Sequence, residues 1–211
     1  MMTRSLFIFL IFLCASCDSS AQSYVFYLHG KIVEDQGAKA VDNINGFGAY
    51  QYNDIVSAFR KEGFTVISEV RKKDTDPKTY SLKVVKQIDS LIKRGVKAES
   101  ITIVGASKGA IISMLISSNL KNKNVNFVFM AGCFNDISES NPDINFYGNI
   151  LSIHEKSDVI GKSCLPVKNK STGITHYKEI EINTGLRHGF LYQPFIVLMN
   201  PTIQWASGKY N

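Results

Sequence analysis

Short apolar runs alternate along this chain with segments whose apolar residues recur every three or four positions. The runs are rich in β-branched and aromatic residues, which predicts strands at residues 24–28, 64–68, 101–104, 126–131 and 149–154, and a more polar strand at 178–182. The periodic segments predict helices at residues 52–61 and 80–94, after residue 107, and from about 192 to 206. The stretch 31–48 follows neither pattern and is expected to be irregular.

Strands and helices that alternate in this way are typical of an α/β protein. Continuous apolar strands indicate a parallel sheet that is covered by helices on both faces, and the polar run at 178–182 is expected near an edge of the sheet. No long linker rich in proline, serine or glycine divides the chain, so residues 22–211 are expected to form one three-layer domain. In the last helix, Pro194 is expected in the first turn and Pro201 in the interior, where it would produce a kink.

The first 21 residues have the pattern of a secretory signal. Arg4 precedes the apolar run Leu6–Leu13, which is too short to span a bilayer, and small and polar residues follow. Two processing routes stay open. The sequence Ser19-Ser20-Ala21 suits a signal peptidase, whereas Leu13–Cys17 resembles a lipobox in which Cys17 would be lipidated, although Cys14 stands where an aliphatic residue is usual. The protein is therefore expected to be exported, either periplasmic or extracellular, or anchored to a membrane as a lipoprotein.

Two cysteines, Cys133 and Cys164, remain after either cleavage. An exported chain meets an oxidising compartment, so the two could form a disulfide, or they could remain one buried and one loop thiol. Histidines and cysteines are scattered without the spacing of metal ligands, so no metal site is expected. The net charge is +6, but the basic residues are not interleaved with aromatic ones, which favours a solvated basic surface over nucleic-acid binding.

The most informative short motif is G-x-S-x-G at Gly105–Gly109, directly after the run 101–104. A strand that enters a helix through one tight turn presents the central residue, Ser107, at the edge of the sheet, and the flanking glycines leave room for that turn. The alternative is that Ser107 is an ordinary helix N-cap.

Two further residues, Asp158 and His188, could act together with Ser107. Asp158 follows the strand at 149–154 and His188 follows the strand at 178–182. The carboxyl ends of parallel strands meet at one edge of a sheet, so we expect Ser107, Asp158 and His188 to lie together there. A serine hydroxyl needs a base to act as a nucleophile, and that base needs an acid to orient it. Asp136, which follows the strand at 126–131, is the alternative acid, and Asp158 and His188 could also be ordinary loop residues.

On these residues, the chain from Tyr24 to the C-terminus resembles a small α/β-hydrolase. The order serine, aspartate, histidine is that of the family, and Leu28–Gly30 resembles its oxyanion loop, which His29 and Gly30 would support. The resemblance implies an oxyanion hole made by the backbone N–H groups of Lys108 and Lys31. The family's first two strands have no counterpart, and no insertion is long enough for a cap domain.

This resemblance implies an exported serine hydrolase that cleaves a small-molecule carboxylic ester and uses no cofactor. A peptidase or a thioesterase would use the same residues, and a catalytically silent hydrolase fold could serve as a binding module. The site is expected to be open to solvent and bordered mainly by residues 31–48. Glu34, Asp35 and Arg71 are candidates for lining the cleft. The side chain of Lys108 is expected to reach solvent, and the alternative is that it contacts an anionic group of the substrate.

Overall fold

The main sheet of the molecule is six-stranded and entirely parallel. The computed structural model describes residues 22–135, 137–142 and 144–211, so the predicted signal with Cys17 and the alternative acid Asp136 lie outside the described residues. Across the sheet the strands follow the order β4 (Thr65–Ile67), β1 (Tyr24–Leu28), β5 (Ile101–Ala106), β6 (Asn126–Met130), β7 (Tyr147–Glu155) and β8 (Gly173–Ile182).

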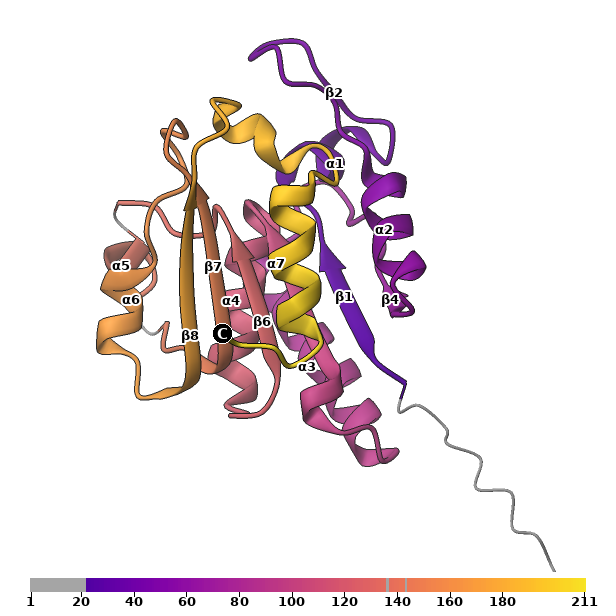
Figure 1. The fold of residues 1–211 in the computed structure, drawn as a ribbon, viewed down its shortest axis with the longest axis vertical. Coiled ribbons are helices and arrows are strands. Elements are labelled where there is room, and N and C mark those ends of the chain that lie inside the picture. The colour runs from indigo at the N-terminus through magenta and orange to yellow at the C-terminus, as the bar shows by residue number, and fades with distance from the viewer. Residues whose placement is uncertain (1–21, 136, 143) are drawn as a thin grey trace, which may run out of the picture.

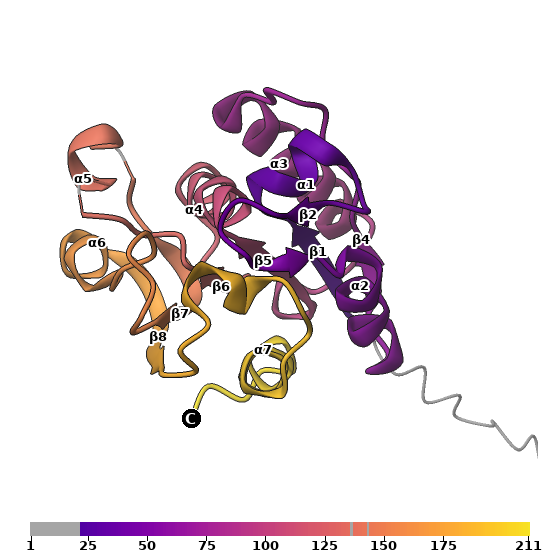
Figure 2. The same ribbon diagram turned by 90° about the horizontal axis from the view of Figure 1, so that it is seen from above.

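Helices cover both faces of this sheet, which confirms the predicted three-layer α/β fold (Figures 1 and 2). One face carries α2 (Tyr52–Lys61) and α7 (Ile196–Ala206). The other face carries α3 (Pro77–Lys93), α4 (Lys108–Leu120) and α6 (Leu165–Lys170). The polar strand β8 lies at one edge, as predicted, and the short strand β4 lies at the other.

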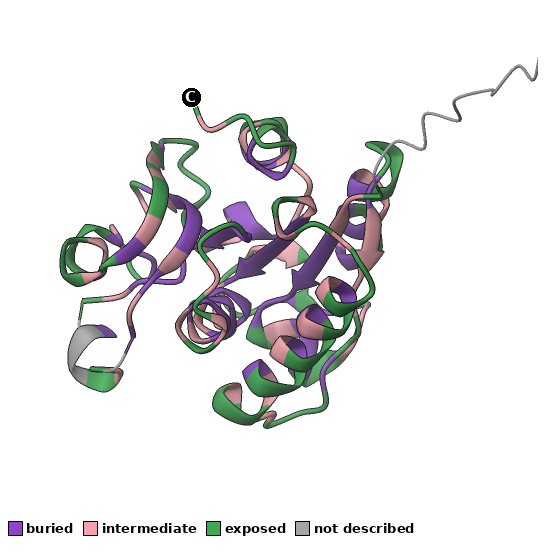
Figure 3. Ribbon diagram, turned by 90° about the horizontal axis from the view of Figure 1, so that it is seen from below, coloured by how far each residue is buried: buried purple, intermediate pink, exposed green. Residues whose placement is uncertain are grey.

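Two apolar cores fill the spaces between the sheet and its helices. Side chains alternate along each strand, so Val25 and Tyr27 of β1 pack with α2 and α7, whereas Phe26 and Leu28 pack with α3 and α4. Every residue of β5 and β6 is buried, because helices cover both of their faces (Figure 3). This double burial explains why the strand signal was a continuous apolar run and not an alternating one.

Several short elements complete the fold: α1 (Lys31–Gln36), β2 (Val41–Asp42), β3 (Gly48–Ala49), η1 (Ala98–Ser100), α5 (Ile137–Ser140) and η2 (Arg187–Leu191). The expectation that residues 31–48 are irregular is therefore wrong. The helix α1 has only six residues, too few to show a helical period, and it ends at Gly37, whose φ of 84° suits glycine. The strands β2 and β3 then form a small antiparallel hairpin.

Two predicted helix boundaries also need correction. The third helix begins at Pro77, because the carboxylate of Asp76 accepts a hydrogen bond from the Thr79 N–H group and caps it. The last helix begins only at Ile196, so Pro194 precedes it and does not occupy its first turn. A proline disfavours helical backbone in the residue before it, which delays the start of this helix. Pro201 lies inside α7, as predicted.

Cys133 and Cys164 form a disulfide, with their Cα atoms 5.3 Å apart, which decides between the two alternatives left open by the sequence. The bond links the segment after β6 to the residue that precedes α6. The same segment is held by a β-bridge between Cys133 and Lys162. Among the helices that the structure describes, none combines the length and the apolar character needed to cross a membrane.

Candidate active site

Ser107 occupies the sharp turn between β5 and α4. Its backbone has φ 53° and ψ −119°, a region that residues with a Cβ rarely adopt. The N–H group of Ser107 donates to the carbonyl oxygen of Met130 at 2.9 Å, which anchors the turn to the end of β6. Strained backbone of this kind is retained where the surrounding structure holds it in place, and it is typical of functional sites.

Two glycines make this turn possible. A Cβ at Gly105 would lie 2.3 Å from Ser113 Oγ and 2.4 Å from the Gly109 carbonyl oxygen. A Cβ at Gly109 would lie only 1.9 Å from the carbonyl oxygen of Leu28, at the end of β1. The two positions therefore admit only glycine if α4 is to pack this closely against β5 and β1.

The predicted base and acid lie beside the serine. His188, on η2, places Nε2 3.0 Å from Ser107 Oγ and Nδ1 2.7 Å from Asp158 Oδ2. An ionised carboxylate can only accept hydrogen bonds, so we assign the ring proton of His188 to Nδ1. Nε2 is then free to accept the hydroxyl hydrogen of Ser107. The three residues that the sequence selected thus form one continuous hydrogen-bonded chain.

The environment of Asp158 keeps its carboxyl group ionised. Burial by itself would raise the pKa of Asp158, but the hydrogen bonds from His188 and from the Ile160 N–H group outweigh burial, and the pKa lies below its ordinary value. The Ile160 N–H group donates to Oδ1 at 2.9 Å. An anionic Asp158 can therefore orient His188 and stabilise its protonated form at neutral pH.

Glu155, at the end of β7, is a site residue that the sequence did not reveal. Its buried carboxylate accepts hydrogen bonds from the backbone and side chain of Ser157, and from the backbone and side chain of Thr184. Burial would raise the pKa of Glu155, but these donors lower it below its ordinary value. Glu155 thus joins the turn that carries Asp158 to the segment that leads into His188.

The two amides proposed for the oxyanion hole belong to the first residues of two helices. Lys31 begins α1 and Lys108 begins α4, and N–H groups in a first helical turn have no acceptor within the helix. A Cβ built on Gly30 would lie 3.5 Å from the Cβ of Ser107, so the two turns lie against each other. The segment that carries Lys31 therefore lies beside Ser107, and both residues line one cavity.

A cavity of about 170 Å³ opens beside these groups. Its lining comprises Gly30, Lys31, Ile32, Tyr50, Ser107, His188, Leu191 and Tyr192. The Tyr50 hydroxyl is hydrogen-bonded to the Tyr27 hydroxyl at 2.6 Å, and the Tyr192 hydroxyl donates to Asp42 at 3.2 Å. Because both hydroxyls already have partners, the two rings serve mainly as apolar walls.

The hairpin of β2 and β3 stands next to the segment that carries His188. Arg187 donates from Nη2 to the Asn45 carbonyl oxygen at 2.9 Å, and its guanidinium carbon lies 4.9 Å from the centre of the Phe47 ring. Residues 31–48 therefore do adjoin the site, but as a helix and a hairpin and not as an irregular loop.

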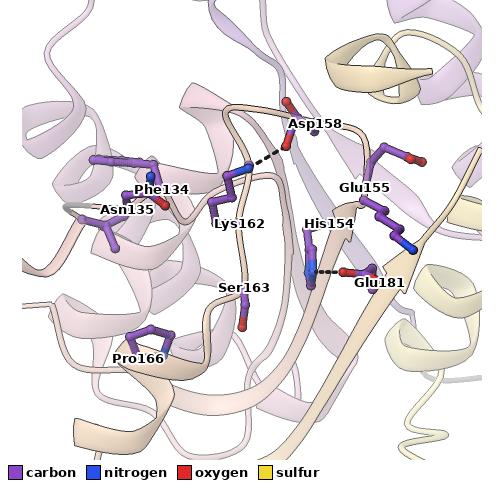
Figure 4. Close-up of a pocket in the computed structure, with 12 residues that line it drawn as sticks. Phe134, Asn135, His154, Glu155, Asp158, Lys162, Ser163, Pro166 and Glu181 are labelled. Carbon is purple, nitrogen blue, oxygen red and sulfur yellow. Dashed lines mark hydrogen bonds and ion pairs between the residues drawn. The ribbon is translucent and has the colours of Figure 1, made fainter. Parts of the chain in front are cut away.

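A larger hollow of about 400 Å³ is lined in part by Asp158 (Figure 4). Lys162 donates from Nζ to the Asp158 carbonyl oxygen at 2.9 Å there, and His154 Nε2 lies 3.4 Å from Glu181. Neither Ser107 nor His188 lines this hollow, so its size does not make it the reaction site.

The other histidines take no part in the Ser107 chain. His154, in β7, pairs with Glu181, and His176 stacks on Tyr210 with ring centroids 4.5 Å apart, near the start of β8. Within residues 22–135, 137–142 and 144–211, no group of three or more histidine, cysteine, aspartate or glutamate side chains is arranged to hold a metal ion.

His29 braces the turn after β1, as expected from the sequence. The Arg71 N–H group donates to His29 Nε2 at 3.0 Å, so the ring proton is assigned to Nδ1, which donates to the Gly30 carbonyl oxygen at 2.8 Å. Burial, and then the positive charge of Arg71, lower the pKa of His29 to about 4. His29 is therefore neutral at neutral pH.

Acid is expected to destabilise the fold through His29. The unfolded chain binds a proton at an ordinary pKa of 6.5 and the folded chain only near 4, so the free energy of unfolding falls as pH drops between these values. The loss attributable to His29 is about 3 kcal/mol over this range. Urea unfolding between pH 7 and pH 4 measures it, with His29→Asn as the comparison. The variant should be less sensitive to acid than the natural chain; equal sensitivity would contradict the assignment.

Two expectations about charged side chains are wrong. The side chain of Lys108 does not extend into solvent, because its Nζ binds Glu34 at 2.5 Å and the Thr75 carbonyl oxygen at 2.8 Å. Glu34 and Arg71 do not line the cavity, because they form a buried ion pair with each other. Asp35 is exposed and pairs with the side chain of Lys31.

Comparisons with known proteins bear on the fold. No protein-family model matches the chain, and no curated protein matches it. Among solved structures, the Francisella virulence factor BioJ shares 14% identity over 90% of this chain and 78% of its own, with a TM-score of 0.59. A putative α/β hydrolase of Agrobacterium tumefaciens shares 16% identity over 92% of this chain and 89% of its own, also with a TM-score of 0.59.

A third similar structure is a hyperthermophilic esterase from Pyrobaculum calidifontis. It shares 15% identity over 92% of this chain and 78% of its own, with a TM-score of 0.58. At these identities the similarity shows that the backbones share the α/β-hydrolase fold.

Proposed function

We propose that this chain, which has the α/β-hydrolase fold, is an exported serine hydrolase that cleaves small carboxylic esters. The observation that carries the proposal is the hydrogen-bonded chain from Ser107 through His188 to Asp158, with distances of 3.0 and 2.7 Å. This is the arrangement that turns a serine hydroxyl into a nucleophile.

In the acylation step, Ser107 Oγ attacks the carbonyl carbon of the ester while His188 Nε2 takes the hydroxyl proton. The negative charge that develops on the carbonyl oxygen is held by the backbone N–H groups of Lys31 and Lys108. Asp158 keeps the Nδ1 proton of His188 in place and stabilises the imidazolium. His188 then gives its proton to the leaving alcohol, the ester bond breaks, and an acyl group remains on Ser107.

In the deacylation step, His188 takes a proton from a water molecule that attacks the acyl carbon. The same two amides hold the second oxyanion. Collapse of this intermediate breaks the bond to Ser107, whose oxygen recovers a proton from His188, and the carboxylic acid leaves. The enzyme thus returns to its starting protonation state with no cofactor consumed.

Two observations favour an ester over the alternatives. The cavity beside Ser107 is small and has apolar walls, and one similar structure is an esterase. A peptidase or thioesterase with the same triad is the near rival, and a thioester or peptide substrate tested in parallel distinguishes them. A silent binding module is disfavoured because hydrolase folds that lose activity usually lose a member of the triad, and here Ser107, His188 and Asp158 are joined.

The proposed export rests on residues 1–21, with cleavage after Ala21 or lipidation at Cys17. The disulfide between Cys133 and Cys164 supports this, because such bonds persist in oxidising compartments. Labelling cells with a fatty-acid analogue separates the two routes, since only the lipoprotein would retain the label on its mature chain.

We expect the purified domain, residues 22–211, to hydrolyse short p-nitrophenyl esters and to react with a fluorophosphonate. The cavity of about 170 Å³ is close to the ~150 Å³ that holds one benzene ring, so acetate and butyrate esters should be cleaved faster than decanoate. Comparison of kcat/KM along the acyl series measures this preference. Well-folded protein that neither turns over any ester nor accepts the fluorophosphonate would overturn the proposed function.

A further inference from the structure

A buried cluster of charges connects the segments that carry the two proposed oxyanion donors. The side chains of Glu34 and Arg71 are fully buried, and that of Lys108 is 18% exposed. Burying charge is costly unless each group is paired and hydrogen-bonded, so a cluster of this kind needs a structural or functional reason. None of the three side chains belongs to the proposed triad.

The centre of the cluster is the carboxylate of Glu34, which lies one turn after Lys31 in α1. It accepts hydrogen bonds from Lys108 Nζ at 2.5 Å, Arg71 Nε at 3.1 Å and the Thr75 N–H group at 3.2 Å. Burial alone would raise the pKa of Glu34, but the bonds from Lys108 and Arg71 lower it below its ordinary value. Glu34 is therefore an anion that binds two cations.

The two cations that bind Glu34, Lys108 and Arg71, are connected to different donors of the proposed oxyanion hole. Lys108 is the residue whose amide would be one donor, and its side chain reaches back to α1. Arg71 donates from Nη2 to the His29 carbonyl oxygen and from its own backbone to the His29 ring. His29 in turn is bonded to Gly30, the residue before the second proposed donor.

We propose that Glu34 is a positioning residue, which fixes the amides of Lys31 and Lys108 relative to each other by tying the start of α1 to the start of α4. This inference rests on the proposed function. Oxyanion donors stabilise a transition state only when they are held in place before the charge develops, and a misplacement of about 1 Å can cost roughly 100-fold in rate.

The expected effect of Glu34 is on the transition state. Donors that are held in place stabilise the charge that develops on the carbonyl oxygen in both steps of the reaction. Binding of the uncharged ester should be largely unchanged, because that charge is absent before the attack.

The test compares Glu34→Gln and Lys108→Met with the natural chain. Lys108→Met breaks the tie from the other side, leaves the ion pair of Glu34 with Arg71 intact and keeps the backbone amide, so it serves if Glu34→Gln folds poorly. Asp35→Asn is the matched control, because Asp35 neighbours Glu34 on α1 but is exposed and pairs with the side chain of Lys31. Titration with a fluorophosphonate counts the reactive serines, so that kcat is expressed per active site.

We expect both variants to lose about 10- to 100-fold in kcat per active site with KM for p-nitrophenyl acetate nearly unchanged, and the Asp35→Asn control to match the natural chain. Affinity for an alkyl boronic acid, whose adduct with serine resembles the tetrahedral intermediate, should fall in parallel with kcat. A purely structural role would reduce the number of reactive serines but not the kcat of each. Variants with kcat per site within about twofold of the natural value would overturn the inference while the function stands. A natural chain with no reactive serine would overturn both.

Discussion

Replacing Ser107 by alanine is expected to lower ester hydrolysis by at least about 10⁴-fold and to abolish fluorophosphonate labelling. The hydroxyl that would attack the ester is removed, and His188 loses the group from which it would take a proton. Initial rates with p-nitrophenyl acetate and gel-based detection of the labelled protein measure the two effects.

The fold of this variant should be preserved, so the loss can be assigned to chemistry. Ser107 has φ 53°, and alanine carries a Cβ like serine, so the substitution neither relaxes nor adds backbone strain. Thermal unfolding should therefore be unchanged. The exposed Ser90, in the last turn of α3, provides a control, because Ser90→Ala removes a hydroxyl that is not part of the Ser107–His188–Asp158 chain. If Ser107→Ala kept more than about a tenth of the activity, another nucleophile would have to be responsible.

Replacing Asp158 by asparagine is expected to lower kcat/KM by roughly 10⁴-fold. The neutral amide can donate a hydrogen bond to Nδ1, which would leave the ring proton on Nε2, and His188 could not then accept the serine proton. The group also loses the charge that stabilises the imidazolium. The measurement is kcat/KM for the best short-chain ester, on protein whose folding is checked by thermal unfolding.

Asp136→Asn is the natural comparison for this experiment. Asp136 lies outside the described residues, and the sequence left it as the alternative acid. We expect Asp136→Asn to retain most of the activity, because Asp158 already occupies the Nδ1 side of His188. A severe loss of activity in Asp136→Asn, together with an active Asp158→Asn, would show that Asp136 is the acid. The proposed reaction class would be unchanged.

The strands and the three residues of the proposed triad could be predicted from the sequence for a shared physical reason. Strands covered on both faces must be apolar along their whole length, so their ends are easy to locate. Because all strands of the sheet are parallel, residues that follow them gather at one edge, even when they are 81 positions apart like Ser107 and His188. Chain order and strand ends therefore sufficed to predict that Ser107, Asp158 and His188 would meet.

The charged surroundings of the site could not be predicted in this way. Glu34 and Lys108 are 74 positions apart, and a glutamate or lysine in a sequence looks the same whether it is solvated or buried in an ion pair. Glu155 likewise joins Ser157, which is two positions away, to Thr184, which is 29 positions away, and the local sequence does not mark that link. The helix α1 was missed because six residues show no period. The roles of Glu34, Lys108 and Glu155 depend on side chains that are distant in the sequence, and a local pattern does not show such partners.

The close approach of α4 to β1 has a practical consequence for directed evolution of this protein. At Gly105 and Gly109 any larger residue would collide with backbone, so mutant libraries that randomise the elbow will consist mostly of misfolded clones. Ile32 and Leu191 line the cavity without belonging to that tight junction. Substitutions at Ile32 and Leu191 can change substrate preference while the turn that presents Ser107 stays intact.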